Sequence, residues 1–273
     1  MKNKTILLMS LCFVAFASCG DDDKDSNNGE NNQPVNNTTP AASQIFTSSG
    51  EENGHNYVDL GLPSGALWAT TNIGGMLPQS YGEYYAWGET STKSGYTWSD
   101  YQYGKDSLAI EKYCADNKHG KDGFIDNIIS LDLTDDAAHV QWGGSWVTPN
   151  ATMRQEIIDE CYWVYTNNYN NSMIAGYIVY KVKQTADKGV VVVKGETPSD
   201  SYSLEDPHIF LPLAGLKAEG KIRYSGTRCL YMASSLYTYN SSRSCGIAIL
   251  EDRIYPSQHP RNYGCPIRPI CFK

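Results

Sequence analysis

A run in the middle of the chain, residues 142–161, determines the position of one helix and the kind of surface it needs. Pro149 disfavours a helical backbone at Thr148, so the helix cannot begin earlier. Asn150 suits the N-cap, because its side-chain oxygen can accept from the free amides of the first turn. At the helical period one face is apolar, formed by Met153, Ile157, Ile158 and Cys161. The polar residues should point away from that face, and they are Arg154, Gln155, Asp159 and Glu160. One apolar face needs one partner, so we expect this helix to pack on a sheet.

Strand-like segments surround the helix on both sides. A turn with Pro63 and Gly65 joins the first two, 57–62 and 66–73. A second helix should begin with Thr134 as its N-cap, with Asp135 and Asp136 at the positive end of the helix dipole. Further strands are expected at 176–183 paired with 189–194, and at 209–213, 230–234, 246–250 and 265–272. Strands outnumber helices and both helices are mid-chain, a pattern that predicts an α+β fold.

The N-terminus is typical of an exported protein. Lys2 and Lys4 precede an apolar run, 5–17, that is too short to span a bilayer but suits a signal peptide. Small residues follow, up to Ser18, and then Cys19. This resembles a bacterial lipobox, which implies cleavage after residue 18 and a lipid on Cys19. An ordinary signal peptide with an unmodified Cys19 is the alternative.

An acidic, polar segment follows Cys19. The run Gly20-Asp21-Asp22-Asp23 resembles the signal that exports Bacteroidetes lipoproteins to the outer face of the outer membrane; a solvated tether is the alternative. Residues 19–53 hold seven acids and one lysine and few apolar groups, so we expect a flexible tether. Much of the formal net charge of -8 therefore belongs to the tether. Residues 54–273 are expected to form one domain, and the absence of a basic stripe argues against nucleic acid as a partner.

Five ordered blocks carry a resemblance to a known family. They are NGHNYVDLGLPSGALWATTNIG, YGEYYAWGET, DLTDDAAHVQWGGSWVTPN, IFLPLAG and YGCPIRPI. Across residues 53–270 the chain resembles the Fibrobacter succinogenes major paralogous domain family, abundant among Bacteroidetes surface lipoproteins. The resemblance implies a C-type-lectin-like fold with two helices beside a twisted antiparallel sheet, on a protein lipid-anchored in the outer membrane and exposed on the cell surface. It supplies no catalytic residues.

Sequence motifs for catalysis and metal binding are missing. The chain has no Gly-x-Ser-x-Gly, His-Glu-x-x-His or Cys-x-x-Cys, and its five histidines are scattered. The tripeptides with which calcium-dependent lectins bind sugars are also missing. We therefore expect no metal, no cofactor and no enzymatic activity.

Six cysteines remain after Cys12 and Cys19 are set aside. An even number in an exported chain favours disulfides, although buried thiols packing as small hydrophobes are the alternative. The candidates are Cys114, Cys161, Cys229, Cys245, Cys265 and Cys271.

The aromatic stretch 81–103 is the first candidate for a ligand surface. Tyr and Trp rings offer flat faces that suit sugars or protein partners, although a β-rich domain also uses such rings in its core. We expect Trp98, Tyr101 and Tyr103 to be exposed, with the loop around Tyr224 as a second candidate. The favoured function is a non-catalytic binding module for a glycan or a host protein. A structural pilus or surface-assembly subunit with an exposed strand edge is the alternative, and an enzyme with a deep polar pocket is the least favoured.

Overall fold

The computed structural model describes residues 46–273, so the predicted signal peptide, Cys19 and most of the predicted tether lie outside the described residues. The fold begins before residue 54, however. Strand β1 (Gly50–Glu52) pairs with β2 (His55–Asp59). The Thr47 hydroxyl donates to the His208 carbonyl and accepts from the His208 amide, each at 3.0 Å. The predicted boundary at residue 54 is therefore too late, because these polar residues are held by backbone pairing rather than by apolar burial.

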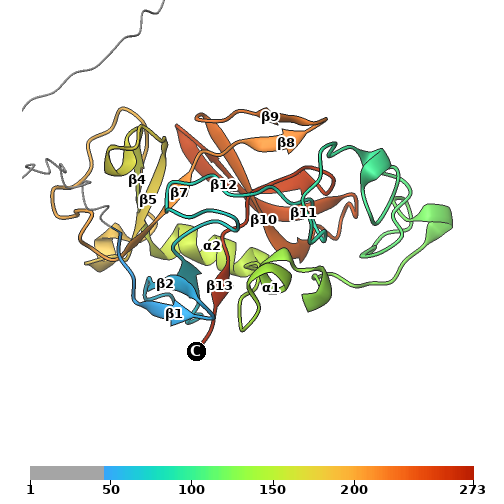
Figure 1. Cartoon of the computed structure of the whole chain (residues 1–273), viewed down its shortest axis with the longest axis horizontal. Helices are drawn as coiled ribbons and strands as arrows, with labels where there is room; N and C mark the ends of the chain where they lie inside the picture. Colours follow the sequence, from blue (N-terminus) through green and yellow to red (C-terminus); the bar gives the residue numbers. More distant parts are fainter. Residues whose placement is uncertain (1–45) are drawn as a thin grey trace, which may run out of the picture. The chain divides into compact units, whose positions relative to one another are not determined.

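The architecture is α+β, with mostly antiparallel sheets and two mid-chain helices (Figure 1). One sheet has the order β1-β2-β3-β13, with β3 at Leu67–Ala69 and β13 at Ile270–Cys271. A second has the order β6-β4-β5-β7, from Val191–Val192, Tyr162–Thr166, Gly176–Tyr180 and His208–Pro212. The third is β10-β11-β12, from Arg228–Leu236, Arg243–Leu250 and Arg253–Pro260, and β8 (Leu216–Ala218) pairs with β9 (Lys221–Arg223).

Several strands differ from the prediction. β4 and β12 were not predicted, and β4 lies between β5 and β6, which we expected to pair with each other. β12 carries Pro256 and Pro260 and few aliphatic residues, so its sequence lacks a strand pattern. The predicted strands at 57–62, 66–73 and 209–213 are confirmed as β2, β3 and β7, although each is shorter or shifted by a residue or more.

Helix α2 (Ala151–Glu160) begins where predicted, with Asn150 Oδ1 accepting from the Met153 amide at 2.9 Å. The shorter α1 (Ala137–Trp142) is capped by Asp136, which accepts from the Ala138 amide at 2.9 Å. The predicted cap at Thr134 is wrong, because Thr134 belongs to a preceding 3-10 turn. The 3-10 turns are Trp98–Asp100, Lys121–Gly123, Leu133–Asp135, Tyr169–Asn171 and Thr185–Asp187.

Arg154 on α2 is buried, contrary to the prediction that it points away from the core. Its guanidinium lies over the rings of Trp68 and Tyr231, 5.3 and 5.6 Å from their centroids, and Nη2 donates to the Met232 carbonyl at 3.1 Å. Aromatic faces stabilise a buried cation. The helix therefore buries a flank that its polarity pattern assigns to solvent.

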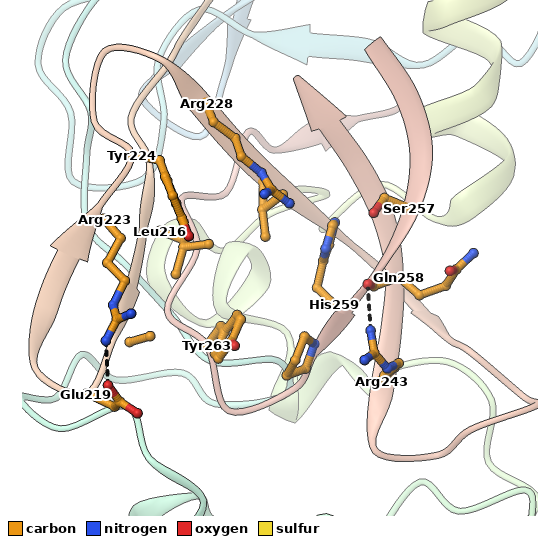
Figure 2. A pocket seen from close by; sticks show the side chains of 13 residues that line it. Leu216, Glu219, Arg223, Tyr224, Arg228, Arg243, Ser257, Gln258, His259 and Tyr263 are labelled. Atoms are coloured by element: carbon orange, nitrogen blue, oxygen red, sulfur yellow. Dashed lines mark hydrogen bonds and ion pairs between the residues drawn. The ribbon is translucent and has the colours of Figure 1, made fainter. Parts of the chain in front are cut away.

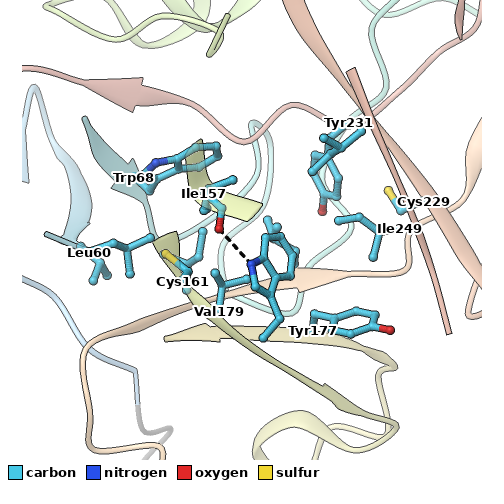
Figure 3. Packing of buried hydrophobic residues seen from close by; sticks show 14 of the residues in the cluster. Leu60, Trp68, Ile157, Cys161, Tyr177, Val179, Cys229, Tyr231 and Ile249 are labelled. Atoms are coloured by element: carbon cyan, nitrogen blue, oxygen red, sulfur yellow. Dashed lines mark hydrogen bonds between the residues drawn. The ribbon is translucent and has the colours of Figure 1, made fainter. Parts of the chain in front are cut away.

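The β10–β12 sheet is covered on both faces. Figure 1 shows α2 on one side of this sheet and the β8–β9 hairpin on the other, and α2 contacts all three strands. Side chains alternate between the faces. Cys229, Tyr231, Ile247 and Ile249 pack with Ile157 of α2 (Figure 3), whereas Leu230, Met232 and Ala248 pack with Leu216 and Ala218 of β8. At one edge of the second face, the charged residue Arg228 lies beyond the apolar residues of β10.

Two fully buried residues, Trp146 and Arg268, act as structural anchors. Trp146 is fully buried, donates Nε1 to the Glu52 carbonyl at 2.8 Å and meets Trp142 edge-on. Arg268 is also fully buried and donates to Asn72 Oδ1 and to the carbonyls of residues 69, 70 and 210 at 2.9–3.2 Å. Both residues therefore join distant segments of the chain, and neither is free to meet a ligand.

Candidate functional site: a pocket between β8–β9 and the β10–β12 sheet

The first predicted ligand surface is part of the core. Tyr101 is fully buried, Tyr103 is 9% exposed and Trp98 is partly buried in a 3-10 turn. The Tyr101 hydroxyl donates to the Trp87 carbonyl at 2.7 Å. The prediction of an exposed aromatic patch is therefore wrong for Tyr101 and Tyr103.

A buried arginine explains why these rings turn inward. Arg261 lies 4.5 Å from the Trp87 ring centroid and donates Nε to the Tyr101 hydroxyl at 2.9 Å. Its two terminal nitrogens donate to the carbonyls of Lys112, Tyr113 and Ser241 at 2.9–3.0 Å. The rings therefore pack around this internal network, whereas Ser99, Asp100 and Gln102 beside them are exposed. The polarity of those neighbours had favoured an exposed loop in the sequence.

The six cysteines are free thiols, so the disulfide prediction is wrong for these residues. Five are buried, and they pack as small apolar side chains. Cys229 belongs to the cluster around α2, whereas Cys265 belongs to the cluster on the opposite face of the β10–β12 sheet. Burial raises the pKa of Cys229 to about 12. The thiol is therefore protonated near neutrality and is a poor nucleophile.

The second predicted candidate, Tyr224, lies on a real cavity of about 320 Å³. The cavity opens between the β8–β9 hairpin and the edge of the β10–β12 sheet (Figure 2). Its charged and aromatic lining residues are Glu219, Arg223, Tyr224, Arg228, Arg243, His259 and Tyr263, and the remainder are Leu216, Ala218, Leu230, Ser257, Gln258 and Pro260. It is a mixed polar and aromatic pocket with an excess of cationic groups.

Arg228 is the first residue of β10 and lines this pocket. Its side chain lies on the same face of the strand as that of Leu230, two residues further on. Its Nε is buried without a hydrogen-bond partner among residues 46–273. Its guanidinium lies 5.6 Å from the centroid of the Tyr224 ring. A buried donor without an acceptor is costly, because it has lost its water and gained no partner. Arg228 is therefore a donor that a bound group could satisfy.

His259 on β12 is the second polar group without a partner. The residue is 2% exposed, and its Nε2 has no hydrogen-bond partner in the described part of the chain. Burial, together with the nearby charges of Arg228 and Arg243, lowers the pKa of His259 to about 4, although the backbone of Ile247 favours the protonated ring. The ring is therefore neutral near pH 7, and His259 lines the pocket with its Nε2 unpartnered in the described residues.

A glycine makes room for this ring. A Cβ on Gly246 would lie 3.1 Å from Cδ2 of His259 and 2.5 Å from the Tyr231 carbonyl oxygen. The absence of a side chain at Gly246 lets the imidazole sit close to β11. This close approach fixes the ring at the base of the pocket.

The other charged residues differ in how they are paired. Glu219 forms an ion pair with Arg223 on the hairpin, so those two charges offset each other. Arg243 donates Nη1 to the Gln258 carbonyl at 3.2 Å and, like Arg228, has no ion pair with a carboxylate in residues 46–273. The Tyr224 ring is 53% exposed, and its backbone holds a positive φ of 61°. The pocket thus combines two uncompensated guanidiniums with an accessible aromatic face.

A second cavity of about 320 Å³ lies beside β4 and β5, lined partly by Tyr165, Tyr169, Tyr180 and Tyr202. Three of these tyrosine hydroxyls already have partners. Tyr169 bonds to Nε2 of His208 at 2.9 Å, Tyr165 donates to Glu251 at 3.1 Å and Tyr202 donates to Asp187. This cavity has equal volume but lacks the unpartnered groups of the first.

Residues 46–273 hold neither a candidate metal site nor a paired-carboxylate site at Asp135 and Asp136. No group of three or more His, Cys, Asp or Glu side chains there could hold a metal ion. Asp135 and Asp136 are not a paired site, since Asp135 bonds to Lys112 at 2.6 Å while Asp136 caps α1 and accepts from Thr148. Neither α1 nor α2 has the length and hydrophobicity to cross a membrane.

The sequence identified one part of the pocket and missed the rest. Tyr224 was named, but His259 was set aside as one of five scattered histidines, and Arg228 and Arg243 were not noticed. A signal was present for Arg228: alternation along β10 places it on the same face as Leu230 and Met232, where a buried strand face ends in a charge. No comparable signal existed for His259, because β12 was not predicted.

We compared the chain with protein-family models, with curated proteins and with solved structures, and none of the three comparisons found a match. The residues of the pocket therefore carry the functional argument.

Proposed function

We propose that this protein is a cell-surface lipoprotein whose domain is a non-catalytic binding module for a glycan or protein ligand, with the pocket at Tyr224, Arg228 and His259 as its binding site. The fold we propose is C-type-lectin-like, on the sequence blocks that resemble the Fibrobacter succinogenes major paralogous domain family. The α+β arrangement and the curled antiparallel sheet are compatible with that proposal.

One observation supports the binding site above all. Arg228 Nε and His259 Nε2 are both buried, both lack a partner within residues 46–273 and both line one cavity. Buried polar groups in folded proteins are normally hydrogen-bonded, so each exception calls for an explanation. A ligand that fills the cavity and bonds to both groups provides one.

The structural-subunit alternative receives less support. It requires a strand edge that can accept a strand from another subunit. β12 ends its sheet, but Pro256 and Pro260 have no backbone N–H, and prolines are a common way of blocking an edge. No described feature favours self-association over ligand binding.

A binding screen tests the proposal. The full chain, purified in detergent, is applied to a glycan array and used in pull-downs from surface extracts. The double variant Tyr224→Ala/Arg228→Gln should lose at least tenfold in affinity for whatever binds. A matched double variant, Tyr239→Ala/Arg253→Gln, removes an exposed tyrosine and an arginine away from the pocket and should bind normally. Equal loss in both variants, or no ligand in either screen, would contradict the proposal.

The proposed anchoring has its own test. Cys19→Ser should abolish fatty-acid labelling, because only the thiol can carry the diacylglyceryl group. Labelling that persists in the variant would show that Cys19 is not the attachment site.

A further inference from the structure

We propose that the pocket binds an acidic sugar residue, with its carboxylate or sulfate on Arg228, a ring hydroxyl on His259 and one ring face on Tyr224. This inference rests on the proposed binding function and specifies the ligand class of the same site.

The first argument is the charge of the pocket. Arg228 and Arg243 have no carboxylate partner in residues 46–273, whereas Arg223 is paired with Glu219. Two guanidiniums without counter-charges, partly removed from water, attract an anion. Arginine suits carboxylate and sulfate groups in particular, because its planar fork can donate two parallel hydrogen bonds. Arg228 is the better placed of the two, since Arg243 already donates to Gln258.

The second argument is the hydrogen-bond character of His259. Its Nε2 is buried without a hydrogen-bond partner in residues 46–273. A hydroxyl can pair with Nε2 in either tautomer of the neutral ring, because it both donates and accepts, whereas a carboxylate or sulfate ion only accepts. One ligand that serves both residues therefore carries an acidic group for Arg228 and a hydroxyl for His259. A sugar that carries both an acidic group and hydroxyls supplies both within a single ring.

The third argument is the shape and lining of the site. Figure 2 shows the Tyr224 ring and the Arg228 and His259 side chains directed into the same space, with Tyr263 closing one side. A flat ring that is 53% exposed can stack on the apolar face of a pyranose. The volume of about 320 Å³ lies at the small end of the usual range for ligand pockets, roughly 300–1,000 Å³, and suits one or two sugar residues rather than a long segment.

An acidic peptide fits the pocket less well. Peptides commonly bind by adding a strand to a sheet edge, and the edge beside this pocket is β12, where Pro256 and Pro260 cannot donate from their backbone. An ionised aspartate or glutamate side chain would satisfy Arg228 but carries no hydroxyl for His259. An acidic sugar satisfies both groups.

The test compares ligands that separate the effect of charge from that of sugar structure. The detergent-purified full chain is titrated calorimetrically at pH 7 with an oligogalacturonate, with its uncharged methyl ester, with a sulfated oligosaccharide and with a polyglutamate peptide. We expect the acid, the sulfated sugar or both to bind at least tenfold more tightly than the methyl ester. Whichever binds identifies carboxylate or sulfate as the acidic group.

The variants connect that preference to the pocket. Arg228→Gln should abolish the preference for the acidic sugar, while Arg253→Gln on β12 should retain it; both must keep the unfolding midpoint of the original protein. His259→Phe, which cannot accept a hydrogen bond, should weaken the acidic sugar while leaving inorganic sulfate unchanged.

The possible failures are distinguishable. If the methyl ester binds as tightly as the acid and binding still requires Tyr224, the inference fails while the proposed binding function stands. Polyglutamate binding as tightly as the sugars overturns the inference in favour of an acidic protein ligand. If none of these probes binds, the acidic-sugar inference fails, and the broader screen decides the proposed function separately.

Discussion

Arg261 and Arg228 provide a comparison between two regions that contain the same kinds of residue. Both arginines lie beside aromatic rings, Arg261 at Trp87 and Arg228 at Tyr224. Arg261 donates four hydrogen bonds to a hydroxyl and three carbonyls. The Arg228 side chain donates none that the structure records in residues 46–273, and its Nε is buried.

For these two arginines, the supply of hydrogen-bond acceptors distinguishes the core residue from the one at the cavity, while the aromatic surroundings are similar. Loop backbone closes over Arg261 and supplies carbonyls, so the rings around it pack into the interior. At Arg228 the opposite wall is the side of a hairpin whose own charges, Glu219 and Arg223, are already paired. The guanidinium is therefore left with an open cavity in front of it.

The largest expected effect is a difference in stability between a variant at the buried ring of Tyr101 and one at the exposed side chain of Tyr224. Tyr101→Ala should lower the free energy of unfolding by about 3–5 kcal/mol, because it creates a cavity and leaves the Trp87 carbonyl and Arg261 Nε unpaired. Tyr224→Ala should change it by less than about 0.5 kcal/mol, since this ring is more than half exposed. Chemical denaturation of both variants measures the contrast. Similar losses in the two would mean that Tyr224 is also a packing residue.

A smaller contrast is expected between the two arginines. Arg261→Gln should cost about 3 kcal/mol, because buried carbonyls lose a charged donor. Arg228→Gln should be nearly neutral or slightly stabilising, since it removes a buried donor that has no hydrogen-bond partner in residues 46–273. Denaturation midpoints at low and moderate salt give the comparison. A strong destabilisation by Arg228→Gln would assign that residue to the core network.

The smallest effect concerns pH and the base of the pocket. The pKa of His259 is about 4 in the folded chain and about 6.5 when unfolded, so the unfolded state binds more protons between those values. The free energy of unfolding should therefore fall as the pH drops from 6.5 to 4, and this histidine should contribute about 2 kcal/mol of the fall. His259→Gln should show a correspondingly shallower slope. His208, whose pKa is also lowered by burial, is unchanged in both proteins, so the difference isolates His259. Parallel slopes would show that His259 titrates normally.

Local chemistry explains which features were predictable from the sequence. The start of α2 was correct because Pro149 and Asn150 act within one turn. Arg154 was misplaced because periodicity assigns residues by polarity, whereas two aromatic rings from other strands bury its guanidinium. The pocket draws on five strands and on the connecting segments that carry Glu219, Tyr224 and Tyr263, so its residues have no common spacing in the sequence. Tyr224 could be suspected alone, but its partnership with Arg228 and His259 depends on the register of β10, β11 and β12.

The pairing of β13 with β3 has a consequence for the time at which the domain can form. Ile270 lies opposite Trp68, and Arg268 bonds to the Ala69 carbonyl across 199 positions of the chain. The entropic cost of closing such a long loop must be met before that contact contributes stability. Because β13 follows every other strand of its sheet by about 200 residues, this sheet cannot be completed until Ile270 and Cys271 have been synthesised. A nascent chain that stops before residue 270 therefore lacks both β13 and the ladder partner of Trp68.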